Sequence, residues 1–257
     1  MILAVDVGNT NTVLGCIEEG KILHTLRMRT EVHATREENA IKIRELLGLV
    51  SVQAEELEGA ILASVLPSFT ASVAEAIEKL SGKRSLIVGP GIKTGLNVKI
   101  DDPTTLGADM AVGAVAVISC YTVPAVIIDM GTATTITVVD GKRSFRGGAI
   151  LPGVRLGFSA LASGTSLLPD IYIARPARCI ATNTVDCMRS GAILGTASMI
   201  DGMIDRMEEE LGEKCFHIAT GSLASSVIAC CKHEIVCDED LLLKGLWALY
   251  QKNNRTR

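Results

Sequence analysis

The sequence predicts an α/β fold that is built twice, with a sheet and covering helices in each half of the chain. An apolar, β-branched run at residues 2–5 leads into Asp-x-Gly at 6–8, followed by small hydroxyl and amide residues. The same pattern returns at mid-chain, in residues 126–135. Each copy precedes segments that alternate between strand-like and helix-like patterns, which is typical of a sheet covered by helices. Two such copies, each opening half of the chain, indicate a duplicated nucleotide-binding fold.

The first half should begin with a β-hairpin. The first strand and its turn lead into an apolar stretch at 13–17, and the alternation at 21–29 suits a strand at the edge of a sheet. Periodicity and turn residues predict the elements that follow, namely helices at 38–47 and 69–80 and strands at 58–65 and 84–88.

A helix is expected from about 106 to 121, because Thr104 or Thr105 can cap its start and small apolar residues follow. It is hydrophobic on almost every side, so we expect it to be buried at the junction of two lobes. Asp109 then lies in the first turn of a buried helix. Taken alone, this carboxylate is most simply an acid that caps the helix or compensates its dipole.

The second half should repeat the architecture of the first. Three strands are expected around the second Asp-x-Gly turn, and the Gly-rich residues 147–153 look too irregular for the interior of an element. The segment 184–211 predicts one long amphipathic helix or a pair of helices. The predicted elements are strands at 125–129, 135–140, 142–146 and 216–220, and helices at 155–162, 184–211 and 240–250.

Composition excludes several classes of function. The chain has 257 residues, 48% of them hydrophobic, so it can bury an ample core as one large domain or two lobes. A net charge of −4 with no run of Lys or Arg argues against nucleic-acid binding. No apolar run approaches the roughly 18 residues that span a bilayer, and the first residues do not resemble a signal peptide. We therefore expect a cytoplasmic protein with no membrane partner.

The eight cysteines are expected to be reduced thiols that act as small buried hydrophobic residues. No C-x-x-C spacing occurs and the histidines do not cluster with the cysteines, so a zinc site is not expected.

The two Asp-x-Gly turns carry the groups that bind phosphate. Gly allows a sharp bend with exposed amides, and Asn and Thr side chains donate hydrogen bonds without adding charge. Asp6, at the end of the first strand, is placed to hold Mg²⁺ directly or through water, because this cation prefers oxygen ligands and keeps several waters. We expect the two turns, one from each half, to hold nucleotide phosphates between them.

A series of motifs in the chain resembles the type III pantothenate kinases, a family of the ASKHA superfamily that also contains acetate and sugar kinases, heat-shock chaperones and actin. The motifs lie in family order over nearly the whole chain. They are residues 6–10 (DVGNT), 64–67 (SVLP), 107–109 (GAD), 129–135 (DMGTATT), 147–153 (GGAILPG), 183–185 (NTV) and 219–221 (ATG). The resemblance implies a two-lobed ASKHA fold (actin-like ATPase, ribonuclease H-like) with duplicated mixed sheets and flanking helices, divided into lobes at 1–114 and 115–257. It also implies ATP-dependent phosphorylation of pantothenate to 4′-phosphopantothenate in coenzyme A biosynthesis, by a homodimer.

The resemblance further implies roles for individual residues. Asp109 would be the catalytic base that accepts the proton of the pantothenate hydroxyl, and Asp129 would bind a monovalent cation, K⁺ or NH₄⁺. The residues implied to contact ATP are Asp6, Val7, Gly8, Asn9, Thr10, Asn11, Thr12, Val13 and Thr132. Those implied to contact pantothenate are Gly107, Ala108, Asp109, Met110 and Thr184.

Departures from the family pattern cluster at the acceptor site. Met110 stands where the family usually has Arg, and a lost charge-assisted hydrogen bond to a substrate carboxylate is worth about 1.5–3 kcal/mol. The other departures are Ile100 for Tyr, Gly164 for Arg, Thr182 for Lys or Arg, and Ser222 for Gly. Two alternatives therefore stay open: a kinase of another small hydroxyl acceptor, and a nucleotide-binding regulatory paralogue without catalysis.

Overall fold

The computed structural model describes residues 1–254, which form two compact units. The first contains Met1–Leu96, Asp101–Tyr121 and the chain from Asp240 onward, and the second contains Asn97–Ile100 and Thr122–Glu239. This division differs from the expected boundary between residues 114 and 115, which would cut helix α3 (Ala108–Cys120). The observed division also places helix α8 (Leu241–Asn254) in the first unit, because α8 packs against α3 and the first sheet.

The first unit is built on a five-stranded mixed sheet with the strand order β3-β2-β1-β4-β5. Its strands are β1 (Ile2–Val7), β2 (Asn11–Glu18), β3 (Lys21–Arg29), β4 (Gly59–Ser64) and β5 (Ser85–Ile87). β1, β2 and β3 form an antiparallel meander, whereas β4 and β5 continue parallel to β1. The expected hairpin and the edge position of the third strand are both confirmed.

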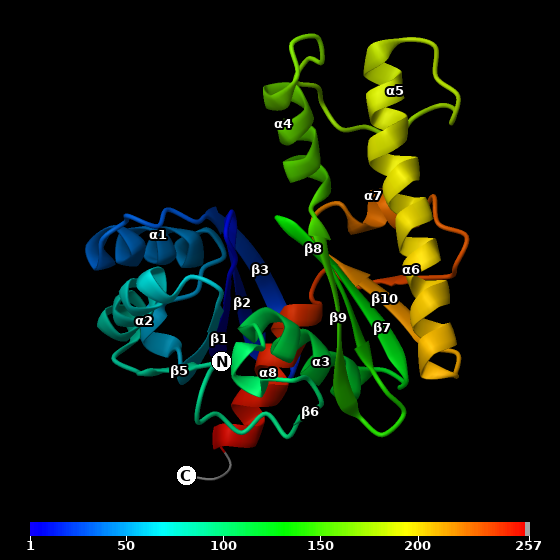
Figure 1. Cartoon of the computed structure of the whole chain (residues 1–257). Helices are drawn as coiled ribbons and strands as arrows, with labels where there is room; N and C mark the ends of the chain where they lie inside the picture. The colour runs from blue at the N-terminus through cyan, green and yellow to red at the C-terminus, as the bar shows by residue number, and fades with distance from the viewer. Residues whose placement is uncertain (255–257) are drawn as a thin grey trace. The chain divides into compact units, whose positions relative to one another are not determined.

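Alternation along β1 divides its side chains between two cores. Leu3, Val5 and Val7 pack with helices α1 (Arg36–Leu49) and α2 (Pro67–Ser81), which lie beside each other in Figure 1. Ile2 and Ala4 pack with α3 and α8 on the opposite face. Successive side chains point to opposite faces of a strand, so Asp6 belongs to the face covered by α3 and α8.

The second unit repeats the topology of the first. Its strands are β6 (Asn97–Val98), β7 (Ala125–Met130), β8 (Ala133–Val139), β9 (Ser144–Pro152), β10 (Phe216–Thr220) and β11 (Val236–Cys237). The strand order is β11-β10-β7-β8-β9-β6. β7, β8 and β9 pair antiparallel, as β1, β2 and β3 do, and β10 and β11 continue parallel to β7, as β4 and β5 do to β1. β7 also has the burial pattern of β1, with only the acidic residue part-exposed. The predicted duplication is confirmed.

Helices cover the β7 face that carries Val126, Ile128 and Met130. They are α4 (Val154–Gly164), α5 (Thr184–Ser190), a π-helical turn (Gly191–Gly195), α6 (Thr196–Leu211) and α7 (Ala224–Ile228). The π turn joins α5 to α6, so the predicted helical segment 184–211 is confirmed and carries an irregularity at its middle. Figure 1 shows α4 and α5 reaching beyond the end of the sheet.

Two local predictions are wrong. The Gly-rich residues 147–152 belong to β9, with a register irregularity beside Gly147 (φ +98°), and do not form a separate bend. Gly148 lies so close to β8 that a Cβ would meet the Ile136 carbonyl, and Gly153 caps α4. Neither Thr104 nor Thr105 caps the buried helix. Those threonines belong to a short 3₁₀ turn capped by Asp102, and α3 begins after Gly107.

The cysteines are mostly not buried. All eight are free thiols, as expected, but only Cys16 is buried, and Cys120, Cys179, Cys187 and Cys237 are exposed. Within residues 1–254 no group of three His, Cys, Asp or Glu side chains is arranged to hold a metal ion. None of the helices in this part of the chain is long and apolar enough to cross a membrane.

Glu208 on α6 is a buried carboxylate with three hydrogen-bond partners. It accepts from Lys214 Nζ at 2.6 Å and the Cys215 amide at 2.9 Å, and it lies 3.0 Å from His217 Nε2. Burial acts to raise the pKa of the Glu208 carboxyl, but the three partners outweigh it and lower the pKa to about 2. This carboxylate therefore fastens α6 to β10 in its ionised form.

Candidate active site

The first Asp-x-Gly turn joins β1 to β2 and presents three exposed polar residues. Asp6 is half-buried and pairs with Val13 across the hairpin, while Val7 pairs with Thr12. The Gly8 amide donates to the Asn11 carbonyl at 3.0 Å and closes the turn. Asn9, Thr10 and Asn11 are exposed, so this turn presents amide and hydroxyl groups to the solvent at the end of the sheet.

Thr12 supports this turn from beneath. Its side chain is fully buried, and its hydroxyl lies 3.0 Å from that of Thr30, which donates to the Gly8 carbonyl at 2.8 Å. The Thr30 amide also donates to the Thr10 carbonyl at 2.9 Å. Thr12 supports the turn through its contact with Thr30, and its expected contact with ATP stays a prediction. Sequence reasoning missed Thr30, whose only signal is a hydroxyl residue directly after an edge strand.

The second turn, at Gly131 and Thr132, is enclosed by two glycines. The Gly153 amide donates to the Thr132 carbonyl at 3.1 Å, and a Cβ on Gly153 would lie 2.5 Å from the Gly131 carbonyl oxygen. A Cβ on Gly221, at φ +101°, would lie 2.5 Å from the Met130 carbonyl oxygen. Only glycine lets both segments approach so closely. They hold the turn while Gly131 and Thr132 stay exposed.

The two turns are structurally equivalent. The Thr30 amide donates to the Thr10 carbonyl, and the Gly153 amide donates to the Thr132 carbonyl. Thr30 directly follows β3, which pairs with β2, and Gly153 directly follows β9, which pairs with β8. Thr10 and Thr132 therefore occupy the same place in the two units. Asp129, at the end of β7, corresponds to Asp6 and lies on the face opposite α4 and α6. Each unit thus combines one carboxylate with a turn of amide and hydroxyl donors.

Asp109 lies at the start of α3, on the face of the first unit that also carries Asp6. Its Oδ1 accepts from the Met110 amide at 2.8 Å, and a Cβ on Gly107 would lie 2.5 Å from this oxygen. Gly107 therefore leaves the space that the half-buried carboxylate occupies. Because Val112 packs in the core beneath Asp6's face, α3 brings Asp109 to the same side of the sheet. The capping contact does not prevent a second role for this carboxylate.

Thr184 is the exposed first residue of α5 in the second unit. Asn183 caps the helix by accepting from the Asp186 amide at 2.9 Å, and it donates to the Asp186 carboxylate at 2.8 Å. This side-chain hydrogen bond, together with contacts from Arg189 and the charge of Arg178, lowers the pKa of Asp186. Positive charge is thus present near Thr184, although Thr182 itself is neutral.

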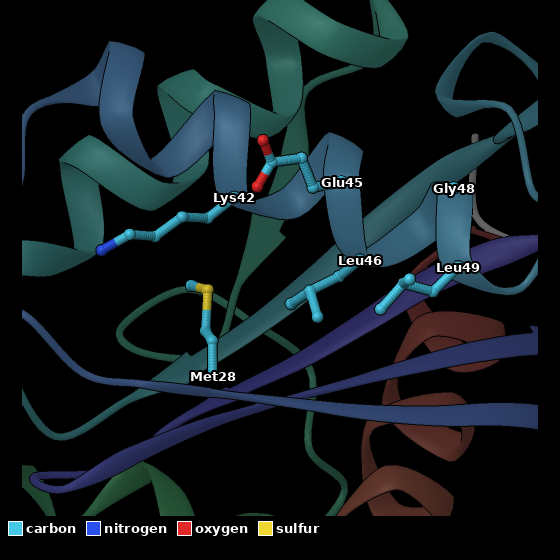
Figure 2. A pocket seen from close by; sticks show the side chains of 6 residues that line it. All are labelled: Met28, Lys42, Glu45, Leu46, Gly48 and Leu49. Atoms are coloured by element: carbon cyan, nitrogen blue, oxygen red, sulfur yellow. The ribbon is translucent and has the colours of Figure 1, made fainter.

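A separate hollow of about 540 Å³ lies between α1 and β3. Figure 2 shows Met28 on β3 beneath Leu46 of α1, with Leu49 beside them. Lys42 at its rim is paired with Glu31 at 2.7 Å. This hollow lies on the α1 face of the sheet, away from the Asp6 face, and contains none of the expected site residues.

Comparison with known proteins identifies close relatives along nearly the whole chain. The family model described as type III pantothenate kinase matches residues 2–206. A curated protein of that name from Halalkalibacterium halodurans is 40% identical over 253 residues, which cover 98% of this chain and 100% of the relative.

Solved structures share the fold at much lower identity. A Campylobacter jejuni protein described as a conserved Baf family transcriptional activator has a TM-score of 0.60 and 17% identity, covering 99% of this chain and 100% of that one. A Sinorhizobium meliloti protein described as a 2-dehydro-3-deoxygalactonokinase has a TM-score of 0.61 and 12% identity, covering 98% and 96%. Together with the duplicated mixed sheets, these likenesses confirm the expected ASKHA-type fold.

Proposed function

We propose that this chain, which belongs to the type III pantothenate kinase family, transfers the γ-phosphoryl group of ATP to the primary hydroxyl of pantothenate. The observation that carries the proposal is the pair of equivalent turns, each of which combines a strand-terminal carboxylate with exposed amide and hydroxyl donors. Phosphoryl transfer needs little covalent chemistry from a protein. It needs positioned phosphates, compensation of charge and an oriented acceptor.

The two turns would bind the nucleotide phosphates. The exposed residues Asn9, Thr10 and Asn11 in the first unit and Thr132 in the second supply neutral donors. Support from Thr30 holds the first turn, and the hydrogen bond from the Gly153 amide to the Thr132 carbonyl holds one side of the second turn before the ligand arrives. A fixed arrangement of donors lowers the cost of ordering the site around a triphosphate.

Asp6 and Asp129 fit the cations that the family implies. Both are carboxylates at strand ends, and oxygen ligands suit Mg²⁺ and K⁺. Bound cations would supply charge compensation for the phosphate oxygens. In our proposal Asp6 holds Mg²⁺, directly or through water, and Asp129 holds the monovalent cation.

Asp109 would orient the acceptor hydroxyl and take its proton. An ionised carboxylate is a weak base, which is sufficient because the loose transition state of phosphoryl transfer depends on orientation more than on early deprotonation. The hydrogen bond from the Met110 amide fixes one carboxylate oxygen, and thereby the direction of the other. Support for this role comes from the position of α3 on the same sheet face as Asp6.

The residues expected to contact the acceptor lack the positive charge that would select the pantothenate carboxylate. Gly107, Ala108, Met110 and Thr184 would contact pantothenate, and Met110 cannot pair with its carboxylate. This observation keeps a second candidate in place, a kinase of another small alcohol. ATP as co-substrate is common to both candidates, and a cytoplasmic location would supply it and keep the thiols reduced.

A homodimer would cover the exposed apolar side chains of the second unit. Leu167 is 90% exposed and Ile180 is 85% exposed, and Tyr172, Leu156 and Leu161 are also exposed. Exposed apolar groups in this number along one segment are typical of an interaction surface. Sedimentation analysis at micromolar concentration should give about twice the monomer mass, and a monomer would contradict this part of the proposal.

The proposal is tested by a direct assay with a matched control. Purified protein is incubated with ATP, Mg²⁺, K⁺ and pantothenate, and phosphopantothenate is measured by mass spectrometry. Asp109→Asn should lower kcat by about 10²–10⁴-fold, whereas Asp101→Asn, at an exposed acid before the helix, should leave it unchanged. Wild-type protein that binds ATP but makes no phosphopantothenate would contradict the proposed acceptor. Equal activity in wild type and Asp109→Asn would contradict the role of Asp109.

A further inference from the structure

Two equivalent threonines have different surroundings in the two units. Thr12 pairs with Val7 across the first hairpin, and Thr134 pairs with Met130 across the second. In each hairpin the partner directly follows the strand-terminal acid. The side chains are 0% and 1% exposed, so each hydroxyl needs a partner inside the protein.

The first unit supplies that partner. The Thr30 hydroxyl lies 3.0 Å from that of Thr12 and donates to the Gly8 carbonyl at 2.8 Å. Three groups are therefore linked beneath the turn, and the inward direction of the Gly8 carbonyl is fixed.

The second unit has no equivalent hydroxyl to pair with Thr134. Gly153 occupies the place of Thr30, as its amide bond to the Thr132 carbonyl shows, and it has no hydroxyl to offer. A larger residue is excluded there, because a Cβ would meet the Gly131 and Thr132 carbonyls. The Thr134 hydroxyl has no hydrogen-bond partner among residues 1–254, a condition shared only with the Ser85 hydroxyl on β5. An unpaired buried hydroxyl destabilises the folded protein, because its hydrogen bonds to water in the unfolded chain are not replaced by hydrogen bonds within the protein.

In the first turn the Gly8 carbonyl is already held by Thr30, whereas the second turn contains a glycine whose peptide could rotate to satisfy the Thr134 hydroxyl. Gly131 is exposed and lacks a Cβ, so the peptide between Gly131 and Thr132 can change direction at low cost. If its carbonyl turns inward toward Thr134, the amide of Thr132 turns outward. An outward amide is the group that a phosphate oxygen accepts from.

We propose that Thr134 is a positioning residue for nucleotide binding, whose hydroxyl donates to the Gly131 carbonyl when this peptide rotates to present the Thr132 amide to a phosphate. The inference rests on the proposed function in one respect, that the second turn binds a nucleotide phosphate. The protein without nucleotide carries the unpaired hydroxyl, and the nucleotide complex does not. Binding therefore relieves an unfavourable feature of the free protein, and this relief favours the nucleotide complex.

The test compares isosteric substitutions at the two threonines. Thr134→Val should raise the Tm of the free protein, because it removes an unpaired hydroxyl, and should weaken binding of a non-hydrolysable ATP analogue by roughly tenfold in Kd. Thr134→Ser, which keeps the hydroxyl, should retain the wild-type Kd. Thr12→Val should lower the Tm, because its hydroxyl is already paired in the free protein. Tm is measured by calorimetry and Kd by titration, so neither readout depends on turnover.

Two results would overturn the inference. A fall in Tm for Thr134→Val of the size found for Thr12→Val would show that Thr134 is an ordinary structural hydroxyl. An unchanged Kd in Thr134→Val would show that the hydroxyl does not take part in binding. These outcomes are distinct from failure of the proposed function, which appears as wild-type protein that binds the ATP analogue and does not phosphorylate pantothenate.

Discussion

Gly153→Ala is the substitution whose effect follows most directly from the geometry of the second turn. The added Cβ would lie 2.5 Å from the Gly131 carbonyl oxygen, and it would meet the Thr132 carbonyl as well. Both obstacles are backbone atoms, so no side-chain rotation relieves the contact and either the turn or the start of α4 must move. Gly153 has φ −63°, so backbone strain does not contribute, and the whole effect comes from overpacking.

The magnitude can be estimated and compared with a control in the same helix. Overpacking of this kind destabilises by about 1–3 kcal/mol. For a chain of this size 1 kcal/mol corresponds to about 2–4 °C in Tm, so we expect a fall of roughly 2–12 °C. Gly157→Ala in α4 makes the same chemical change with open space around the new Cβ, and it should raise the Tm because Ala favours a helix interior by about 0.5–1 kcal/mol.

Calorimetry on the three proteins measures both shifts, and an ATP titration measures the effect on the site. Displacement of the turn should also raise the KM for ATP in Gly153→Ala and leave it unchanged in Gly157→Ala. A Gly153→Ala protein as stable as wild type, with the same KM, would refute the view that this close approach shapes the turn.

The remaining predictions concern charge. Glu208→Gln should lower the free energy of unfolding at neutral pH by roughly 3 kcal/mol. The pKa of the Glu208 carboxyl falls from 4.5 to about 2 on folding. The carboxylate therefore stabilises the protein above pH 4.5, and this stabilisation is lost as the pH falls toward 2. Denaturant titrations from pH 7 to pH 2 should therefore show a weaker pH dependence in Glu208→Gln and no change in the exposed control Glu209→Gln. Met110→Arg should lower the KM for pantothenate by about tenfold, because the guanidinium can form a charge-assisted hydrogen bond to the pantothenate carboxylate. The KM for the neutral alcohol analogue of pantothenate should be unchanged. An equal change for both substrates would contradict a contact with the carboxylate. Replacement of K⁺ by Na⁺ should lower kcat in wild type but not in Asp129→Asn, and rates independent of the cation in wild type would remove the role given to Asp129.

The sequence predicted most of the fold because alternation and turn residues are local signals. The two hairpins, the duplication and the segment 184–211 all follow from periodicity within one stretch of chain. The return of α8 to the first unit could not be predicted in this way. Its amphipathic face fits any apolar surface, and only packing against α3 and β1 selects one.

The errors at individual residues have a similar origin. The glycines at 147–153 predict a bend because Gly is unfavourable inside strands, whereas the close approach of β8 requires Gly at 148. The average behaviour of cysteine predicts buried side chains, and that average does not determine the position of Cys179 or Cys187. For the candidate site, motif order gave the two turns and Asp109. The support by Thr30 comes from another strand, so spacing along the chain does not reveal it.

The central claim is that equivalent turns from the two units hold a single nucleotide. A crystal structure with a non-hydrolysable ATP analogue, Mg²⁺ and pantothenate tests it most directly. We expect phosphate oxygens within about 2.7–3.2 Å of donors at both Thr10 and Thr132, and the pantothenate hydroxyl within the same range of an Asp109 oxygen. A nucleotide bound at one turn only, or an acceptor hydroxyl remote from Asp109, would contradict the account.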